Sequence, residues 1–191
     1  MVETTADPVT AAYVIRPETP DDFARVAEVV AAAFGSDVEA DLVERIRASP
    51  EFVPAMALVA TNAQDRDAEI VGHVMVSGAL LRSADHERRI VMLSPLAVAP
   101  AHQGRGVGGA LVRTVTEIAD RLGEPLVVLE GSPRYYSRFG FTQARPLGIT
   151  IHLPDWAPPE AAQVLCLSSY DADDRTLRGT VVYPAAFDEV D

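Results

Sequence analysis

Cysteine is nearly absent from this sequence of 191 residues, in which Cys166 is the single example. One cysteine excludes an intrachain disulfide framework and indicates a reducing compartment. The thiol lies in the apolar run 164–167, which predicts packing in the core rather than a reactive group. A chain of this length buries enough surface to fold without a disulfide or a structural metal, and no metal is expected.

Long uncharged apolar stretches are also missing, since none reaches the roughly 20 residues that a membrane-spanning helix requires. Residues 1–7 have neither the basic start nor the apolar segment of a secretory signal. We therefore expect a cytoplasmic protein with no membrane partner.

Basic residues are few relative to acidic ones, 16 against 28, which gives a formal net charge of −12. An acidic protein repels a phosphate backbone, so nucleic acid is not expected as a partner. A cationic amine or a basic peptide suits this charge better, although acidic surfaces are also common for solubility alone.

The hydrophobic pattern predicts one α/β domain over residues 13–191, preceded by a disordered tail over residues 1–12. Apolar residues at helical spacing predict helices at about 19–34, 38–47, 107–122 and 133–139. Apolar runs predict about seven strands, at 13–17, 52–61, 69–81, 90–98, 125–130, from 141, and 162–168, with a last extended segment at 177–183.

Four glycines occur within six residues, directly before the most periodic helix: Gly104, Gly106, Gly108 and Gly109. Without a Cβ atom the backbone can approach a phosphate closely, and the positive end of the helix faces the anion. A loop that needs positive φ angles but binds nothing is the alternative, yet four glycines exceed what a turn needs. The loop therefore predicts a phosphate-binding site.

The loop fits two kinds of phosphate ligand. Residues 104–109 match the dinucleotide fingerprint G-x-G-x-x-G, and Glu130 lies at a strand end where such a site would hold the ribose. Against this, residues 99–103 separate the loop from the preceding strand, and only about 80 residues follow it. A nicotinamide-dependent oxidoreductase therefore remains the weaker alternative.

A second pattern in the same segment is Gln103-x-x-Gly106-x-Gly108, preceded by Leu-Ala-Val-Ala-Pro at 96–100. It resembles the motif with which the GNAT acetyltransferase superfamily binds the pyrophosphate of coenzyme A. Residues 135–141, Tyr-Tyr-Ser-Arg-Phe-Gly-Phe, resemble the second signature of that family and lie at the family's spacing.

The resemblance covers a core at about 13–145 and leaves the C-terminal strands and extension at 146–191. Within that extension, residues 179–187 are similar to the YhbS-like branch of predicted acetyltransferases. The family implies a GNAT-type α/β (α+β) fold, with a mixed, mostly antiparallel central sheet of about seven strands flanked by helices.

The resemblance also implies acetyl-CoA as co-substrate and no metal. The backbone of Leu96, Ala97 and Val98 would pair with the pantetheine arm like an added strand, and an amide there would polarise the thioester carbonyl. Arg105 would add charge or remain solvated. The loop that would bind the pyrophosphate comprises Gln103, Gly104, Arg105, Gly106, Val107, Gly108 and Gly109.

For catalysis, Tyr136 matches the tyrosine of the family signature and is the expected general acid, because a phenol can protonate a leaving thiolate. Tyr135 is the fallback. Glu130, at the end of a strand where the family's fourth and fifth strands splay apart, is the candidate base. His73 is expected to be a core or sheet-face residue, and Ser94 or a water chain could relay the proton instead.

These residues predict an N-acetyltransferase that acts on an unidentified primary amine. The amine belongs to a small molecule, a peptide or a protein. A non-catalytic acyl-CoA-binding module is the second hypothesis, but it would have no need of Tyr136. Homodimers are frequent in the family, so a homodimer is a further expectation.

Overall fold

The structure, a computed structural model, describes residues 13–62 and 69–188. The tail expected at 1–12 lies outside these residues. The helices are α2 (Phe23–Phe34), α3 (Val38–Arg47), α4 (Val107–Arg121) and α5 (Pro133–Tyr136). The strands are β1 (Tyr13–Pro17), β2 (Ala57–Asn62), β3 (Ile70–Arg82), β4 (Glu87–Val98), β5 (Leu126–Glu130), β6 (Thr142–Gln143), β7 (Ile149–Thr150), β8 (Ala162–Cys166) and β9 (Gly179–Val182).

All of these strands belong to one sheet, in the order β1-β2-β3-β4-β5-β8-β6, and β9 pairs with β3 and β7. The pairs β4–β5 and β7–β9 are parallel and the others are antiparallel. The predicted mixed, mostly antiparallel sheet is confirmed. β9 lies in the extended segment expected at 177–183, whereas the two-residue strand β7 was not expected. The strand expected from residue 52 begins only at Ala57, because Pro54 opens a 3-10 turn before it.

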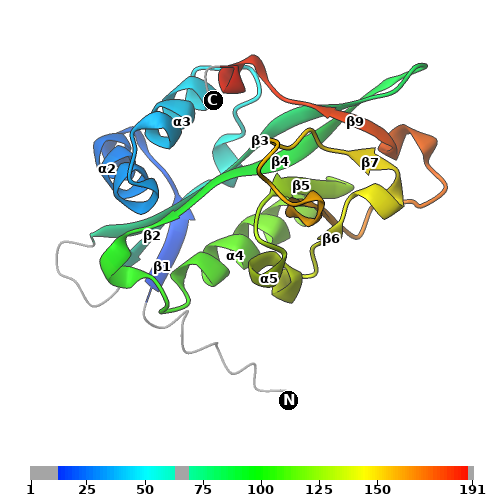
Figure 1. Cartoon of the computed structure of the whole chain (residues 1–191). Helices are drawn as coiled ribbons and strands as arrows, with labels where there is room; N and C mark the ends of the chain where they lie inside the picture. The colour runs from blue at the N-terminus through cyan, green and yellow to red at the C-terminus, as the bar shows by residue number, and fades with distance from the viewer. Residues whose placement is uncertain (1–12, 63–68, 189–191) are drawn as a thin grey trace.

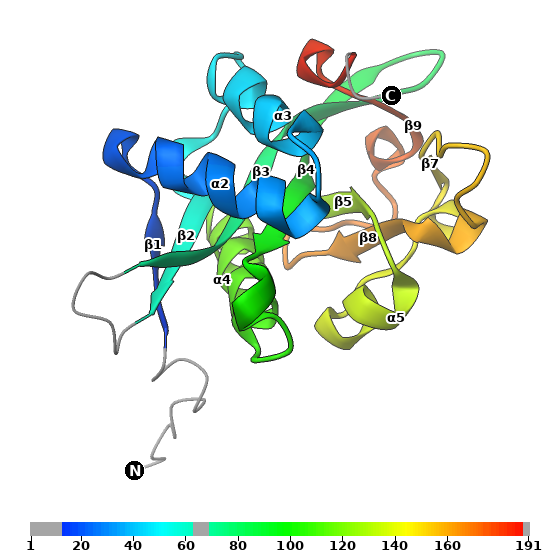
Figure 2. The same ribbon diagram turned by 60° about the vertical axis from the view of Figure 1, so that its left-hand side comes forward.

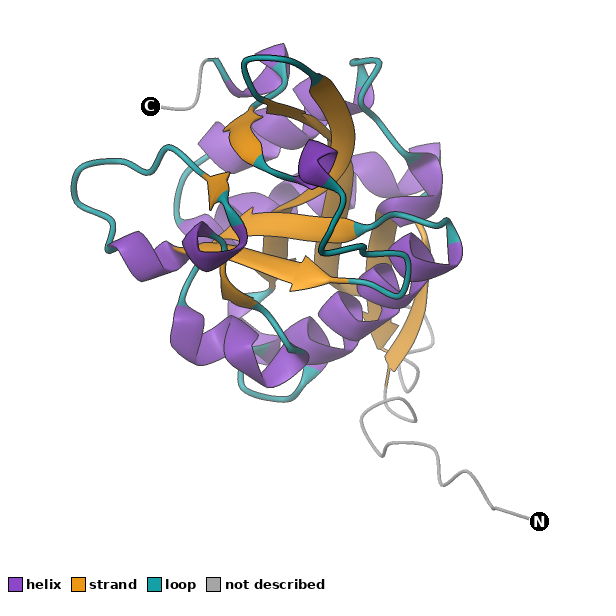
Figure 3. Cartoon of the chain, turned by 90° about the vertical axis from the view of Figure 1, so that its right-hand side faces the viewer, coloured by secondary structure: helices purple, strands orange, loops and turns teal. Residues whose placement is uncertain are grey.

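Helices α2 and α3 cover one face of the sheet and α4 covers the other (Figures 1 and 2). Each face has its own group of buried apolar side chains, one packed under α2 and α3 and the other under α4. Figure 3 views the molecule from the side of its C-terminal half, where helices and loops surround the strands. None of the helices in the described ranges combines the length and apolar composition needed to cross a membrane.

A buried polar cluster fixes α3 to the rest of the domain. Glu18, in the turn after β1, pairs with Arg47 at the end of α3 at 2.8 Å, and the two side chains are 2% and 6% exposed. The Nε2 atom of His73 on β3 lies 3.0 Å from the same carboxylate, and His73 is fully buried. The expectation that His73 belongs to the core is therefore confirmed. The cluster matters for function because α3 forms one wall of the site described next.

Candidate active site

The central parallel strands of the sheet separate after a short pairing. Strands β4 and β5 pair only at Val91 with Val127 and at Met92 with Val128. Beyond these pairs β4 continues to Val98 without β5 beside it, so one edge of β4 is open there. This is the splay at which the sequence analysis placed Glu130, the last residue of β5.

A bulge in β4 lies next to this opening. Val74 of β3 faces Leu96 and Val76 faces Leu93, so residues 94–95 of β4 lie opposite a single residue of β3. A bulge bends its strand and increases the local twist. The bend therefore occurs where β4 separates from β5.

The backbone groups of β4 at the open edge can be assigned from its pairing. The amide of Ala99 donates to the carbonyl of Val71 in β3 at 2.9 Å. Because backbone groups alternate between the two sides of a strand, those of Ala97 also point toward β3. Those of Leu96 and Val98 point to the open side, and Val98 accepts a hydrogen bond from Gln103 Nε2 at 3.0 Å.

The glycine loop ends in the first turn of α4. Gly104 and Gly106 have φ angles of +72° and +89°, a region that favours glycine, and Gly106 is the N-cap of α4. The first intrahelical bond of this turn is donated by Ala110 to the Gly106 carbonyl at 3.0 Å. The amides of residues 107–109 therefore have no intrahelical acceptor and face the end of the helix. Arg105 is exposed beside them.

Gly108 and Gly109 differ from the first two glycines, because both are buried. A Cβ atom on Gly108 would lie 2.5 Å from the hydroxyl of Tyr135, and one on Gly109 would lie 3.4 Å from the ring of Phe139. A side chain at Gly108 would clash, whereas the contact at Gly109 is an ordinary one. Gly104 and Gly106 thus shape the loop, and Gly108 lets α4 pack closely against the segment around α5.

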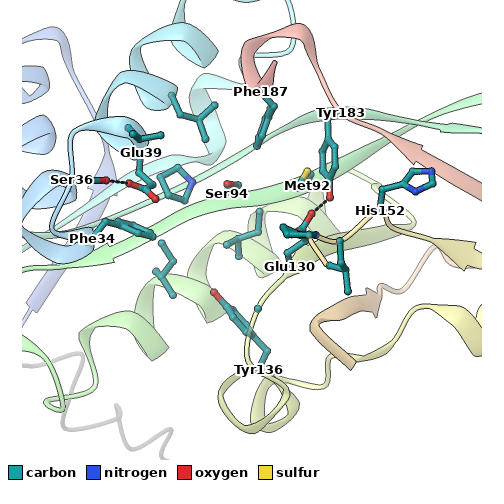
Figure 4. A pocket seen from close by; sticks show the side chains of 18 of the residues that line it. Phe34, Ser36, Glu39, Met92, Ser94, Glu130, Tyr136, His152, Tyr183 and Phe187 are labelled. Carbon is teal, nitrogen blue, oxygen red and sulfur yellow. Dashed lines mark hydrogen bonds between the residues drawn. The ribbon is translucent and has the colours of Figure 1, made fainter. Parts of the chain in front are cut away.

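Tyr136 reaches the cavity from the other side of the splay. Its ring contacts Gly131, where a Cβ atom would lie 2.5 Å from Tyr136 Cε2, and it packs edge-on against Phe141 at 5.6 Å and Tyr135 at 4.9 Å between ring centroids. Burial of the ring, and to a smaller extent the neighbouring Tyr135, raises the pKa of the Tyr136 phenol. The phenol therefore keeps its proton at neutral pH. Its hydroxyl points into the cavity (Figure 4).

The cavity itself has a volume of about 940 Å³ and lies between α2, α3, β4, β5 and the C-terminal segment. Tyr136, Glu130 and Ser94 all line it, and apolar side chains form most of its walls. The lining residues are Phe34, Ser36, Val38, Glu39, Leu42, Met92, Leu93, Ser94, Pro95, Leu96, Glu130, Gly131, Tyr136, His152, Leu153, Pro154, Trp156, Tyr183 and Phe187.

Glu130 has a partner that sequence reasoning missed. The hydroxyl of Tyr183, just after β9, donates a hydrogen bond to the Glu130 carboxylate (Figure 4). Partial burial raises the pKa of Glu130, and the bond from Tyr183 opposes this rise. Tyr183 also stacks on Phe187, which lines the same cavity. Its only signal in the sequence was its place in the segment 179–187.

Two other predicted residues lie outside the cavity. His73 is sealed beneath α3, where its ring Nδ1 has no partner among the described residues. Cys166 is exposed, so the expectation that it packs in the core is wrong. It is the last residue of β8, where the strand ends, whereas Val164 two positions earlier is fully buried. Within the described residues, no group of three or more His, Cys, Asp or Glu side chains is placed to hold a metal ion.

Comparison with known proteins gives consistent matches. The family model for the acetyltransferase (GNAT) domain matches residues 14–144. The uncharacterised N-acetyltransferase YjhQ of Escherichia coli is 33% identical over 161 residues, which cover 84% of this chain and 86% of YjhQ. The uncharacterised N-acetyltransferase YhbS of the same organism is 33% identical over 130 residues, covering 68% and 74% of the two chains.

Two solved structures are similar over almost the whole chain. The crystal structure of Escherichia coli YhbS in complex with CoA has a TM-score of 0.77 and 27% identity, and the match covers 94% of each chain. A GNAT family acetyltransferase from Brucella melitensis in complex with acetyl-CoA has a TM-score of 0.70 and 30% identity, covering 92% of this chain and 97% of the other.

Proposed function

The chain belongs to the GNAT acetyltransferase family, and we propose that it transfers the acetyl group of acetyl-CoA to a primary amine. One observation carries the proposal. Tyr136 and Glu130 line the same cavity, which opens at the free edge of β4. A module that only bound acyl-CoA would have no need of an acid and a base on one cavity, so an enzyme is favoured. The nicotinamide alternative has no comparable support from the matched relatives.

The residues that would bind acetyl-CoA lie along one path. The outward backbone groups of Leu96 and the outward amide of Val98 could bond an extended pantetheine arm, as an added strand would, whereas the Val98 carbonyl already accepts a hydrogen bond from Gln103. Ala97, which was expected to take part, turns its backbone groups toward β3 instead. The amides of residues 107–109 form the positive N-terminal end of α4. Together with the loop around Gly104 and Gly106, they suit the negatively charged pyrophosphate. Coenzyme A bound to the related YhbS supports the same ligand here.

The cavity residues would move the protons of the reaction. The amine nitrogen attacks the thioester carbonyl carbon, the C–N bond forms and the C–S bond breaks. Tyr136, whose raised pKa keeps it protonated, would give its proton to the sulfur that leaves. Glu130 would accept a proton from the amine, directly or through a water beside Ser94. Tyr183 would hold the Glu130 carboxylate toward the cavity.

The proposed cofactor is tested by thermal unfolding. At a concentration of about 100 times Kd, acetyl-CoA is expected to raise Tm by roughly 5–10 °C, because a ligand that binds only the folded state stabilises it by mass action. NADH at the same concentration should give no shift. A shift of equal size with NADH would refute the coenzyme A assignment.

A matched pair of glycine variants completes this test. Gly106→Val places a side chain where φ is +89° at the start of α4, and Gly123→Val does so where φ is +79° just beyond its end. Both should lose comparable stability through backbone strain. Only Gly106→Val should raise the Kd for acetyl-CoA, by about tenfold or more. Equal affinities in the two variants would show that the loop does not bind the phosphates.

The role of Tyr183 predicts a change in pH dependence. Its bond stabilises the charged form of Glu130, so Tyr183→Phe is expected to raise the pKa of Glu130 further. If Glu130 is the base, the acidic limb of kcat/KM should move to higher pH by roughly half a unit to one unit. Tyr170→Phe, which does not touch the cavity, should leave the limb in place. A limb that stays fixed in Tyr183→Phe would argue for a base other than Glu130.

A further inference from the structure

We propose that the acceptor is a primary amine attached to an apolar, aromatic-sized body that carries no carboxylate or phosphate, and that this body binds against Phe34, Val38 and Trp156. The inference rests on the acetyl transfer proposed above and identifies the chemical class of its acceptor. Two independent properties of the cavity carry it, the exposed apolar rim and the sign of the charges.

The rim of the cavity is formed by exposed apolar side chains from distant parts of the sequence. Within the described residues, the large hydrophobic side chains that are exposed include Phe34 at 46%, Val38 at 38% and Trp156 at 85%. Phe34 ends α2, Val38 begins α3 and Trp156 lies in the loop before β8, yet all three line one cavity. Apolar surface left in water at a cavity mouth marks a ligand site.

The charges inside the cavity select against anions. Glu39 and Glu130 line it, and no described lining residue is a lysine or an arginine. The Glu39 carboxylate is held by the hydroxyl of Ser36 at 2.7 Å. The histidine that lines the cavity, His152, lies on the far side of Glu130 from Glu39 (Figure 4). An ammonium group is therefore attracted, whereas a carboxylate or phosphate on the acceptor would meet like charge with no cation to pair with.

Together these properties exclude several acceptor types. A free amino acid and an amino sugar phosphate carry the wrong charge next to the amine, and a small polar amine leaves the apolar rim uncovered. An arylalkylamine satisfies both conditions, and 2-phenylethylamine is the simplest probe. L-Phenylalanine adds only a carboxylate to it, and ethanolamine replaces the ring by a hydroxyl group.

Binding can be measured without turnover because Trp156 is the single tryptophan of the chain. Titration with 2-phenylethylamine should shift the emission of Trp156 to shorter wavelength as the indole is covered, with saturation. Ethanolamine should need a concentration at least about tenfold higher because it lacks the ring, whose burial strengthens binding by about 10- to 100-fold. L-Phenylalanine keeps the ring but should also need at least about tenfold more, because its carboxylate meets Glu39 and Glu130. Equal titration curves for the three compounds would overturn the proposal.

Turnover gives the second measurement, by release of the coenzyme A thiol from acetyl-CoA. The sequence has no lysine, so acetylation of the enzyme's own lysines cannot contribute to the signal. We expect kcat/KM for 2-phenylethylamine to exceed that for ethanolamine by at least about tenfold because of the buried ring, and that for L-phenylalanine by at least about tenfold because of the repelled carboxylate. If acetyl-CoA binds but all three amines react alike, or none reacts above the blank, the acceptor class is wrong while coenzyme A binding stands.

Variants separate the two properties of the cavity. Phe34→Ala should raise KM for 2-phenylethylamine several-fold with little change in kcat, because the ring contributes equally to ground and transition states. Leu122→Ala removes an exposed side chain of 55% exposure at the far end of α4 and should change neither. Glu39→Lys should raise the reactivity of L-phenylalanine relative to 2-phenylethylamine by about tenfold or more. An unchanged preference in Glu39→Lys would contradict the charge argument.

Discussion

Replacing Tyr136 with phenylalanine is expected to lower kcat by about 100-fold while acetyl-CoA affinity changes by no more than about twofold. Phenylalanine keeps the ring that packs against Gly131 and Phe141 and removes only the hydroxyl that points into the cavity. A group that acts in the transition state should lower kcat and kcat/KM together. The expected loss is at the low end for a general acid because water can donate the proton in its place.

Tyr135→Phe is the internal control for this prediction. The hydroxyl of Tyr135 lies against Gly108 of α4, and Tyr135 does not line the cavity. We expect a loss of less than about fivefold in kcat from this variant. Full activity in Tyr136→Phe would reassign Tyr136 to packing, and a collapse in Tyr135→Phe alone would show that the neighbouring tyrosine donates the proton.

Much of the fold could be predicted because its signals are local. The continuous apolar run of β4, the glycine loop and the periodic face of α4 follow one another in the sequence, and each predicts its own structure. Tyr136 and Glu130 could be placed on one site because the family signature and a strand end fix their elements. Both residues line the same cavity in the structure.

The parts that could not be predicted depend on contacts between distant segments. An extended segment was expected at 177–183, but the sequence did not show that β9 would pair with β3, about 100 residues earlier. This pairing brings Tyr183, which comes just after β9, next to Glu130, and no local sequence pattern connects those two residues. The rim formed by Phe34, Val38 and Trp156 is equally nonlocal, since each side chain by itself reads as an ordinary apolar residue.

One expectation was wrong, and one was incomplete, because each depends on the fold. The apolar run around Cys166 predicted burial, but Cys166 is the last residue of β8, and the thiol is exposed there although Val164 on the same face of the strand is buried. The four glycines were interpreted as one phosphate site, and the fold adds that the buried Gly108 makes room for the hydroxyl of Tyr135. A glycine in the sequence indicates that a side chain would not fit there, whereas only the fold shows which neighbouring group occupies the space.

The second large effect is expected in stability, from the cluster that holds α3. Glu18→Gln should lower the free energy of unfolding at pH 7 by about 3 kcal/mol, because it removes the buried carboxylate that pairs with Arg47 and leaves the guanidinium only the half-exposed Glu44. Glu28→Gln is the matched control, since Glu28 pairs with Arg25 on the surface and its side chain is 65% exposed. That variant should cost less than about 0.5 kcal/mol. Urea unfolding of both proteins measures the difference.

The same cluster gives the sign of the pH dependence. Burial tends to raise the pKa of Glu18, but hydrogen bonds from Arg47 and His73 outweigh burial and lower the pKa to about 2, from an ordinary value of 4.5. A lowered pKa means that Glu18 contributes its full stability above pH 4.5 and loses it as the pH falls toward 2. The gap in stability between wild type and Glu18→Gln should therefore narrow over that interval. A gap that stays constant would show that the carboxylate is not charged in the folded protein.

The cluster also connects stability to the acceptor site. Arg47 ends α3, and the first turns of that helix bring Val38, Glu39 and Leu42 to the cavity. Loss of the buried pair should loosen this wall while β4, the glycine loop and α4 remain packed on their own core. Glu18→Gln is thus expected to raise KM for the amine by a few-fold more than it raises the Kd for acetyl-CoA. Equal effects on the two ligands would mean that the cluster supports the whole domain rather than the acceptor wall.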